Sequence, residues 1–164
     1  MKKMSTESPL KLNTPRAIAT LLFFVVVLLG MGTFIGTQSA PGDWYETLKK
    51  PSFNPPNWIF GPVWTVLYLF IAVAGWRTFR QASRSAAMKL WVTQMVLNWA
   101  WSPFFFVFHQ LWFALVILLG MLAAIGLFIA NRWLPDRTAA LLFCPYLAWV
   151  GFAGLLNLSL ALLN

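Results

Sequence analysis

The segment AIATLLFFVVVLLGMGTFIG, residues 17–36, carries no charged side chain and decides the class of the protein. As an α-helix it would rise about 30 Å, which is the thickness of the hydrocarbon core of a bilayer. Four more uncharged apolar segments follow, at residues 58–76, 90–108, 111–130 and 139–163. Because lipid offers the backbone no hydrogen bonds, each segment should be helical. The sequence predicts an all-α membrane protein, a five-transmembrane-helix bundle.

The composition indicates that lipid covers most of the protein surface. Of the 164 residues, 60% are hydrophobic and 10% are charged, and the mean hydropathy is +0.71. A small soluble domain cannot bury so large an apolar fraction. We expect residues 1–15 to form a flexible basic tail and residues 16–164 to form one transmembrane domain.

The positive charge is distributed unevenly between the connections. The formal net charge is +8, and with alternating topology all Lys and Arg residues except Lys49 and Lys50 fall on one side of the membrane. Cytoplasmic connections collect Lys and Arg, so the N-terminus is predicted to be cytoplasmic. A bacterial inner membrane is favoured, with an outer membrane as the alternative. This pattern suits anionic headgroups, and no nucleic acid is expected as a partner.

Ionisable side chains are absent from all five predicted spans, which argues against a proton-coupled pump. The chain has one histidine, His109, and one cysteine, Cys144. A metal site needs three or four suitable ligands, so no metal and no cofactor are expected.

Ten tryptophans fall into two groups. Six lie near span ends, where indole rings favour the membrane–water boundary: Trp44, Trp58, Trp76, Trp91, Trp112 and Trp133. The other four, Trp64, Trp99, Trp101 and Trp149, lie deeper. A buried indole N–H needs a partner, so these side chains are expected to face the interior of the bundle.

Helical spacing places aromatic and polar side chains on one face of three spans. These faces comprise Trp64 and Tyr68; Trp91, Gln94, Asn98, Trp101 and Phe105; and Tyr146, Trp149, Ala153 and Asn157. The faces could pack directly against one another, or they could line a cavity for a flat apolar ligand. Spacing alone favours neither interpretation.

Three motifs resemble the translocator protein family, also called tryptophan-rich sensory proteins or peripheral benzodiazepine receptors. They are WYETLKKPSFNPPNWIFGPVWTVLY (44–68), LNWAWSPFFF (97–106) and PYLAWVGFAGLLN (145–157). The resemblance implies a five-helix bundle, often a homodimer, that binds porphyrins such as protoporphyrin IX and, in some members, sterols. Bacterial members are associated with the regulation of tetrapyrrole metabolism. The last ten residues, LLNLSLALLN, lack the tyrosine and basic residue of the animal cholesterol pattern.

The resemblance also implies roles for individual residues. Trp64 and Trp149 match the cavity tryptophans linked to ligand binding and to light-dependent porphyrin breakdown. Asn98, Trp101, Trp112 and Ala153 match other lining positions, and the helical faces add Tyr68 and Tyr146. The long connector, residues 37–57, would cap the cavity as a lid carrying Trp44, Pro51, Pro55, Pro56 and, just beyond it, Trp58. Its prolines would lower the entropy lost on ordering the lid.

Three functions are consistent with these patterns. The leading hypothesis is a membrane sensory protein, not an enzyme, that binds a porphyrin and acts in tetrapyrrole regulation or trafficking. The alternative is an enzyme that degrades protoporphyrin IX in light, with Trp64 and Trp149 as catalytic residues. In the third, the bundle is purely structural and binds no ligand.

Overall fold

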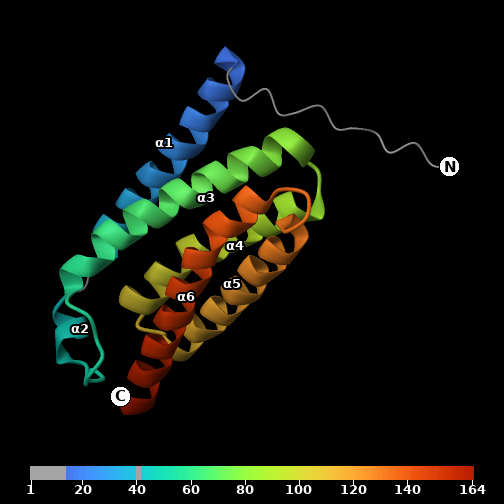
Figure 1. The fold of residues 1–164 in the computed structure, drawn as a ribbon. Helices are drawn as coiled ribbons and strands as arrows, with labels where there is room; N and C mark the ends of the chain where they lie inside the picture. Colours follow the sequence, from blue (N-terminus) through green and yellow to red (C-terminus); the bar gives the residue numbers. More distant parts are fainter. Residues whose placement is uncertain (1–13, 40–41) are drawn as a thin grey trace.

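The computed structural model describes residues 14–39 and 42–164, and within these residues the secondary structure is entirely helical (Figure 1). The α-helices are α1 (Pro15–Gln38), α2 (Asp43–Thr47), α3 (Phe60–Ala82), α4 (Ala86–Phe106), α5 (Leu111–Arg132) and α6 (Arg137–Leu163). A short 3-10 helix, η1 (Asn57–Ile59), leads into α3. The predicted tail lies outside the described residues as far as residue 13, and its last residue, Pro15, instead begins α1.

Hydroxyl and carboxyl side chains set the starts of three long helices. The side chains of Thr14, Ser85 and Asp136 accept hydrogen bonds from backbone N–H groups in the first turns of α1, α4 and α6. Such N-caps satisfy donors that have no partner within the helix. The helices therefore begin at defined residues, although apolar sequence alone would leave their starts open.

Four helical segments are long and apolar enough to cross a membrane: Pro15–Gln38, Asn57–Ala82, Leu111–Arg132 and Arg137–Leu163. The helix α4 is not among them, because polar side chains such as Gln94 and Asn98 lower its mean hydropathy. The sequence predicted five spans, whereas four helical segments have the length and hydropathy of a span. The helix α4 is a fifth long helix within the same bundle.

The long helices pack as neighbours along the chain, with α1 at the edge of the bundle (Figure 1). The helices α4, α5 and α6 form consecutive antiparallel contacts, α3 packs on α6, and α1 packs on α3 and α4. One face of α1 is left uncovered, and Phe23 and Val26 are 64% and 67% exposed there. We expect lipid to cover this face.

Two tryptophans assigned to the membrane boundary from sequence lie inside the bundle instead. Trp76 is 6% exposed and its Nε1 donates to the carbonyl of Ala17 over 3.0 Å. Trp91 is 7% exposed and its Nε1 donates to the carbonyl of Ile71 over 3.0 Å. The boundary prediction was wrong for both because α3 and α4 extend past the predicted span ends, so these residues lie one or more turns inside each helix.

The predicted loop between the first two spans is partly helical. The helix α1 continues to Gln38, α2 follows, and η1 begins at Asn57, so the irregular part is shorter than residues 37–57. The side-chain amide of Asn164 pairs with the peptide of Lys49, accepting from its N–H over 2.9 Å and donating to its carbonyl over 3.2 Å. The connector is thereby attached to the C-terminal end of α6, beside which α2 lies in Figure 1.

At the opposite end of the bundle, one buried carboxylate joins three helices. Asp136 accepts from Arg77 through Nε and Nη2 over 2.9 and 2.8 Å, and from Gln81 over 2.8 Å. Arg132 donates to Gln81 and lies 3.6 Å from the Asp136 carboxylate. Burial opposes ionisation, yet hydrogen bonds from Arg77 and the Ala139 amide, together with both arginine charges, hold the pKa of Asp136 below its usual value.

Candidate functional site

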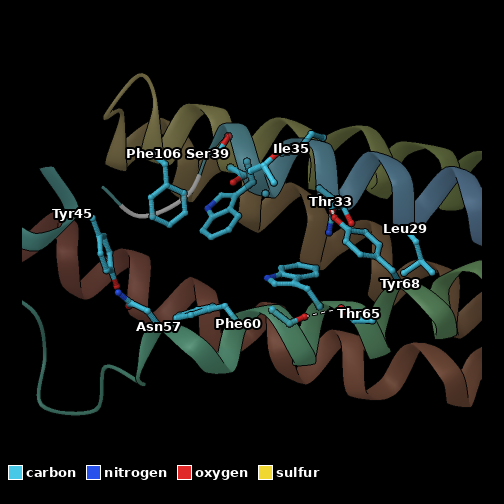
Figure 2. Close-up of a pocket in the computed structure, with 18 residues that line it drawn as sticks. Leu29, Thr33, Ile35, Ser39, Tyr45, Asn57, Phe60, Thr65, Tyr68 and Phe106 are labelled. Carbon is cyan, nitrogen blue, oxygen red and sulfur yellow. Dashed lines mark hydrogen bonds between the residues drawn. The ribbon is translucent and has the colours of Figure 1, made fainter. Parts of the chain in front are cut away.

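A cavity of about 410 Å³ lies between α1, α3 and α4, at the end of the bundle covered by α2 (Figure 2). In Figure 2 it runs from Tyr45 and Asn57 at one end to Leu29 and Tyr68 at the other. Residues of α1 form one wall, and residues of α3 such as Phe60 and Thr65 form the facing wall. Its volume falls in the usual range for small-molecule pockets, about 300–1,000 Å³.

The aromatic wall of the cavity is built mainly on α3. Trp64 and Tyr68 are four residues apart, so the helical repeat places them on the same face. Their ring centroids are 5.6 Å apart with an interplanar angle of 32°. Behind them, the ring of Tyr146 on α6 meets Trp64 edge-on at 6.2 Å. Flat ring faces at this spacing suit a flat, polarisable ligand.

A chain of uncharged hydrogen bonds forms the deep end of the site. The hydroxyl of Tyr68 donates to Asn98 Oδ1 over 2.7 Å, and Asn98 Nδ2 donates to the Tyr146 hydroxyl over 2.9 Å. The Tyr146 hydroxyl in turn donates to Gln94 Oε1 over 2.9 Å. Because the partners come from α3, α4 and α6, the chain fixes the relative positions of these three helices. Its polar atoms are satisfied without any charge.

Trp101 connects the cavity to α5 and α6. Its Nε1 donates to Asn157 Oδ1 over 3.3 Å, and Asn157 Nδ2 donates to the carbonyl of Leu111 over 2.8 Å. These bonds hold the indole ring of Trp101 as part of the wall. The ring is therefore already oriented in the absence of a ligand, which lowers the entropy lost on binding.

None of the described residues that line the cavity carries a charge. The described residues also contain no group of three or more His, Cys, Asp or Glu side chains that could hold a metal ion. Tyr45, in the lid helix α2, lines the cavity with a titratable hydroxyl. Burial raises its pKa, although the hydrogen bond from its hydroxyl to Asn54, 3.0 Å long, works in the opposite direction. The cavity can therefore bind by ring stacking and neutral hydrogen bonds.

The predicted lid residues occupy defined positions in the connector. Trp44 stacks on His109 in the turn between α4 and α5, with ring centroids 3.9 Å apart. Pro51 accepts from Asn54 N–H over 3.0 Å, and Pro56 caps η1. The carbonyl of Pro55 accepts from the Asn54 side chain over 3.1 Å. The remaining predicted lid residue, Trp58, is 73% exposed in η1, just before α3.

The structure brings together some predicted site residues and separates others. Trp64, Tyr68, Asn98 and Trp101 line the cavity, with Tyr146 directly behind them. Trp149 lies instead in an apolar groove on the outer side of the bundle, between α3 and α6. Ala153 is buried between helices, and Trp112 is 57% exposed on α5. Neither of these two residues reaches the cavity lining.

Sequence reasoning missed the contribution of α1. Gly32, Thr33, Gly36 and Thr37 all line the cavity. A Cβ atom at Gly32 would overlap the ring of Tyr68, so the glycine lets this ring of α3 pack against the backbone of α1 in the same chain. Two glycines four residues apart, as at Gly32 and Gly36, are typical of helix packing, and this spacing carries no signal of a binding surface.

Comparisons with known proteins agree with this architecture. The profile of the TspO/MBR family matches residues 20–163. The translocator protein of Bos taurus is 39% identical over 142 residues, covering 80% of this chain and 82% of that protein. The tryptophan-rich protein TspO of Archaeoglobus fulgidus is 37% identical over 156 residues, covering 93% and 99%. Protein CrtK of Rhodobacter capsulatus is 34% identical over 133 residues, covering 79% and 83%.

These matches confirm the resemblance inferred from the three sequence motifs. They extend over nearly all of the described helices, including α1, which the motifs did not cover. Together with the apolar helices, they establish a multi-pass integral membrane protein. This chain belongs to the TspO/MBR family.

Proposed function

We propose that the protein binds a flat, mostly apolar small molecule of the porphyrin type in the cavity between α1, α3 and α4. The observation that carries this proposal is an uncharged cavity of about 410 Å³ walled by Trp64, Tyr68 and Trp101. Binding there would regulate tetrapyrrole metabolism or trafficking, as a sensory protein does.

The chemistry of the lining defines how such a ligand would sit. Aromatic rings and methyl groups would cover the macrocycle, while neutral donors and acceptors would contact its polar edge. No cation lines the cavity, so a buried carboxylate would lack a partner and would lose its hydration. The propionate groups of a porphyrin would therefore remain at the rim, near the lid.

The same proposal includes a fifth membrane span and an orientation. The helix α4 has 21 residues and would rise about 31 Å. Its polar residues Gln94 and Asn98 are buried and hydrogen-bonded inside the bundle, so they do not meet lipid. With five spans, the excess of Lys and Arg falls on the side of the N-terminus, which would be cytoplasmic in a bacterial inner membrane.

The test is a titration of the detergent-purified protein with protoporphyrin IX in the dark, followed by tryptophan fluorescence. We expect saturable quenching in the wild type. In Trp64→Phe the dissociation constant should rise by about fivefold to tenfold, because a smaller ring covers less of the macrocycle. The matched control is Trp133→Phe at the opposite end of the bundle, which should bind as the wild type does. Linear, unsaturable quenching in all three proteins would exclude the binding function.

Illumination of the same samples tests the alternative of a light-dependent degrading enzyme. The structure separates the two tryptophans proposed for that reaction, since Trp64 lines the cavity and Trp149 lies in the outer groove. A binding protein without catalytic activity should leave protoporphyrin IX equally stable in light with Trp149→Phe and with the wild type. Bilirubin-like products that form in light only with the wild type, while Trp149→Phe still binds, would favour the enzyme.

A further inference from the structure

We propose that the ligand enters and leaves the cavity sideways, from within the bilayer, through a gap between α1 and α3. This inference rests on the proposed ligand-binding function. The first observation that supports it is that the exposed lining residues lie on only two sides of the cavity. They are Thr33, Gly36 and Thr37 on α1, and Asn57, Gly61 and Thr65 on η1 and α3. The lining residues contributed by α2 and α4 are all buried or half-buried. The cavity is therefore open along the seam between α1 and α3.

Small residues keep this seam unfilled. No atom of a neighbouring element lies within 4 Å of the position that a Cβ would take at Gly36 or at Gly61. The hydroxyls of Thr37 and Thr65 donate to carbonyls of their own helices, over 2.8 and 2.9 Å. Because those donors are satisfied locally, the two threonines add no unpaired donor to the gap.

The surface around the gap is apolar. Phe34 on α1 is 61% exposed, and Val66 and Leu69 on α3 are 47% and 38% exposed. Thr33 and Thr65 each lie five residues inside their helix ends, which places them about 8 Å from those ends. In a bilayer the inner part of the gap, at Thr33 and Thr65, would therefore face acyl chains.

The lid closes the other approach. Tyr45 is 3% exposed, Trp44 stacks on His109, and the Lys49 peptide is paired with Asn164. Entry from water past α2 would break these contacts, whereas entry through the seam breaks none of them. A ligand that first dissolves in the bilayer reaches the cavity without passing the lid, and this selects for molecules that partition into lipid.

The experiment places a side chain in the gap and measures exchange rates. Gly36→Leu, Gly61→Leu and the double variant are compared with the wild type in nanodiscs, by stopped-flow tryptophan quenching with protoporphyrin IX. Gly30→Leu on α1 is the matched control, because Gly30 is exposed, has open space at its Cβ position and does not line the cavity. Leucine favours helix over glycine, so the variants should fold, and thermal unfolding checks this.

We expect both the association and the dissociation rate constants to fall by about tenfold or more in the double variant, because the leucine side chains fill the gap. Gly30→Leu should exchange at the wild-type rate. If saturable binding persists in the double variant with both rate constants within about twofold of wild type, the lateral route is wrong. A raised dissociation constant caused only by faster dissociation would also overturn it, because the leucines would then merely occupy ligand space. Absence of saturable binding in the wild type would refute the binding function itself, and the route with it.

Discussion

Where α3 begins, polar side chains surround a cavity of about 410 Å³, whereas where α3 ends they close around the single carboxylate of Asp136. The polar groups of the cavity end are neutral, and they pair one with another between Tyr68, Asn98 and Tyr146. At the other end, two arginines and a glutamine converge on one acid. The hydrogen-bonded side chains of the cavity end border a space of about 410 Å³, whereas those of the other end converge on one carboxylate.

Because of this difference, we expect the carboxylate end to contribute mainly to stability and the cavity end mainly to ligand binding. Charged groups in a water-poor site are strongly coupled, so removal of one leaves the others without compensation. Neutral hydrogen bonds can be made and broken at lower free-energy cost, and a cavity wall can shift toward empty space. Substitutions at the carboxylate end should therefore act on folding, and substitutions at the cavity end on binding.

The largest expected effect is that of Asp136→Ala. The change leaves the buried guanidinium of Arg132 and the half-buried guanidinium of Arg77 without their anion, and it also removes the N-cap of α6. We expect a loss of about 3–5 kcal/mol in the free energy of unfolding. Unfolding by SDS in mixed micelles measures this loss. Asp43→Ala, at an exposed carboxylate in α2, is the control, and equal effects of the two changes would contradict the comparison.

Glycine substitutions compare the packing of the two regions directly. A Cβ at Gly75 would overlap the ring of Trp91, which is buried and held by its bond to Ile71, so Gly75→Ala should lower the unfolding free energy by about 1–3 kcal/mol. A Cβ at Gly32 would overlap Tyr68, but that ring borders the cavity and can move into it. Gly32→Ala should therefore weaken protoporphyrin IX binding more than it weakens folding.

The matched control for both glycines is Gly126→Ala, because open space surrounds that position. It should leave the unfolding free energy unchanged or slightly higher, since alanine favours helix. The same SDS titration serves all three variants. If Gly32→Ala proved as destabilising as Gly75→Ala, the cavity end would be as tightly packed as the rest of the bundle.

The acid sensitivity of the protein should come from the carboxylate end. The pKa of Asp136 is lower in the folded state than in the unfolded state, so the unfolded chain binds the proton first as the pH falls. The stabilisation is complete above about pH 4 and is lost as the pH falls through the lower, folded-state value. The loss of stability at low pH should be smaller than the loss caused by Asp136→Ala, because burial of the carboxylate works against its ionisation. Thermal unfolding in a nonionic detergent across this range, with Asp136→Asn losing the dependence, is the measurement.

The cavity end was easier to predict from the sequence than the carboxylate end. Trp64, Tyr68, Asn98 and Trp101 recur at helical spacing within long motifs, so their shared faces were visible without coordinates. Asp136 follows Pro135 between two apolar segments, a position typical of an ordinary turn residue. Its partner Arg77 is 59 positions away on α3, and the sequence carries no signal of that pairing.

The packing of an indole ring inside the bundle was the other property that the sequence did not reveal. Trp76 and Trp91 stand at the ends of apolar runs, yet their helices continue and their rings pack inside the bundle. An indole ring at the end of an apolar segment can lie either at the membrane–water boundary or inside the bundle, because both places supply apolar contacts and a hydrogen-bond acceptor. The backbone acceptors that decide between them, at Ala17 and Ile71, come from other helices.

The smallest expected effect concerns Trp112, where the family resemblance and the structure point in different directions. The resemblance implies a lining position, but the side chain is 57% exposed on α5 and does not line the cavity. Trp112→Phe should change the unfolding free energy by less than about 0.5 kcal/mol and leave protoporphyrin IX affinity unchanged. The titration used for Trp64→Phe measures this directly. A loss of affinity like that of Trp64→Phe would mean that Trp112 contacts ligand bound to another copy of the chain, because its own cavity lies on the other side of α4.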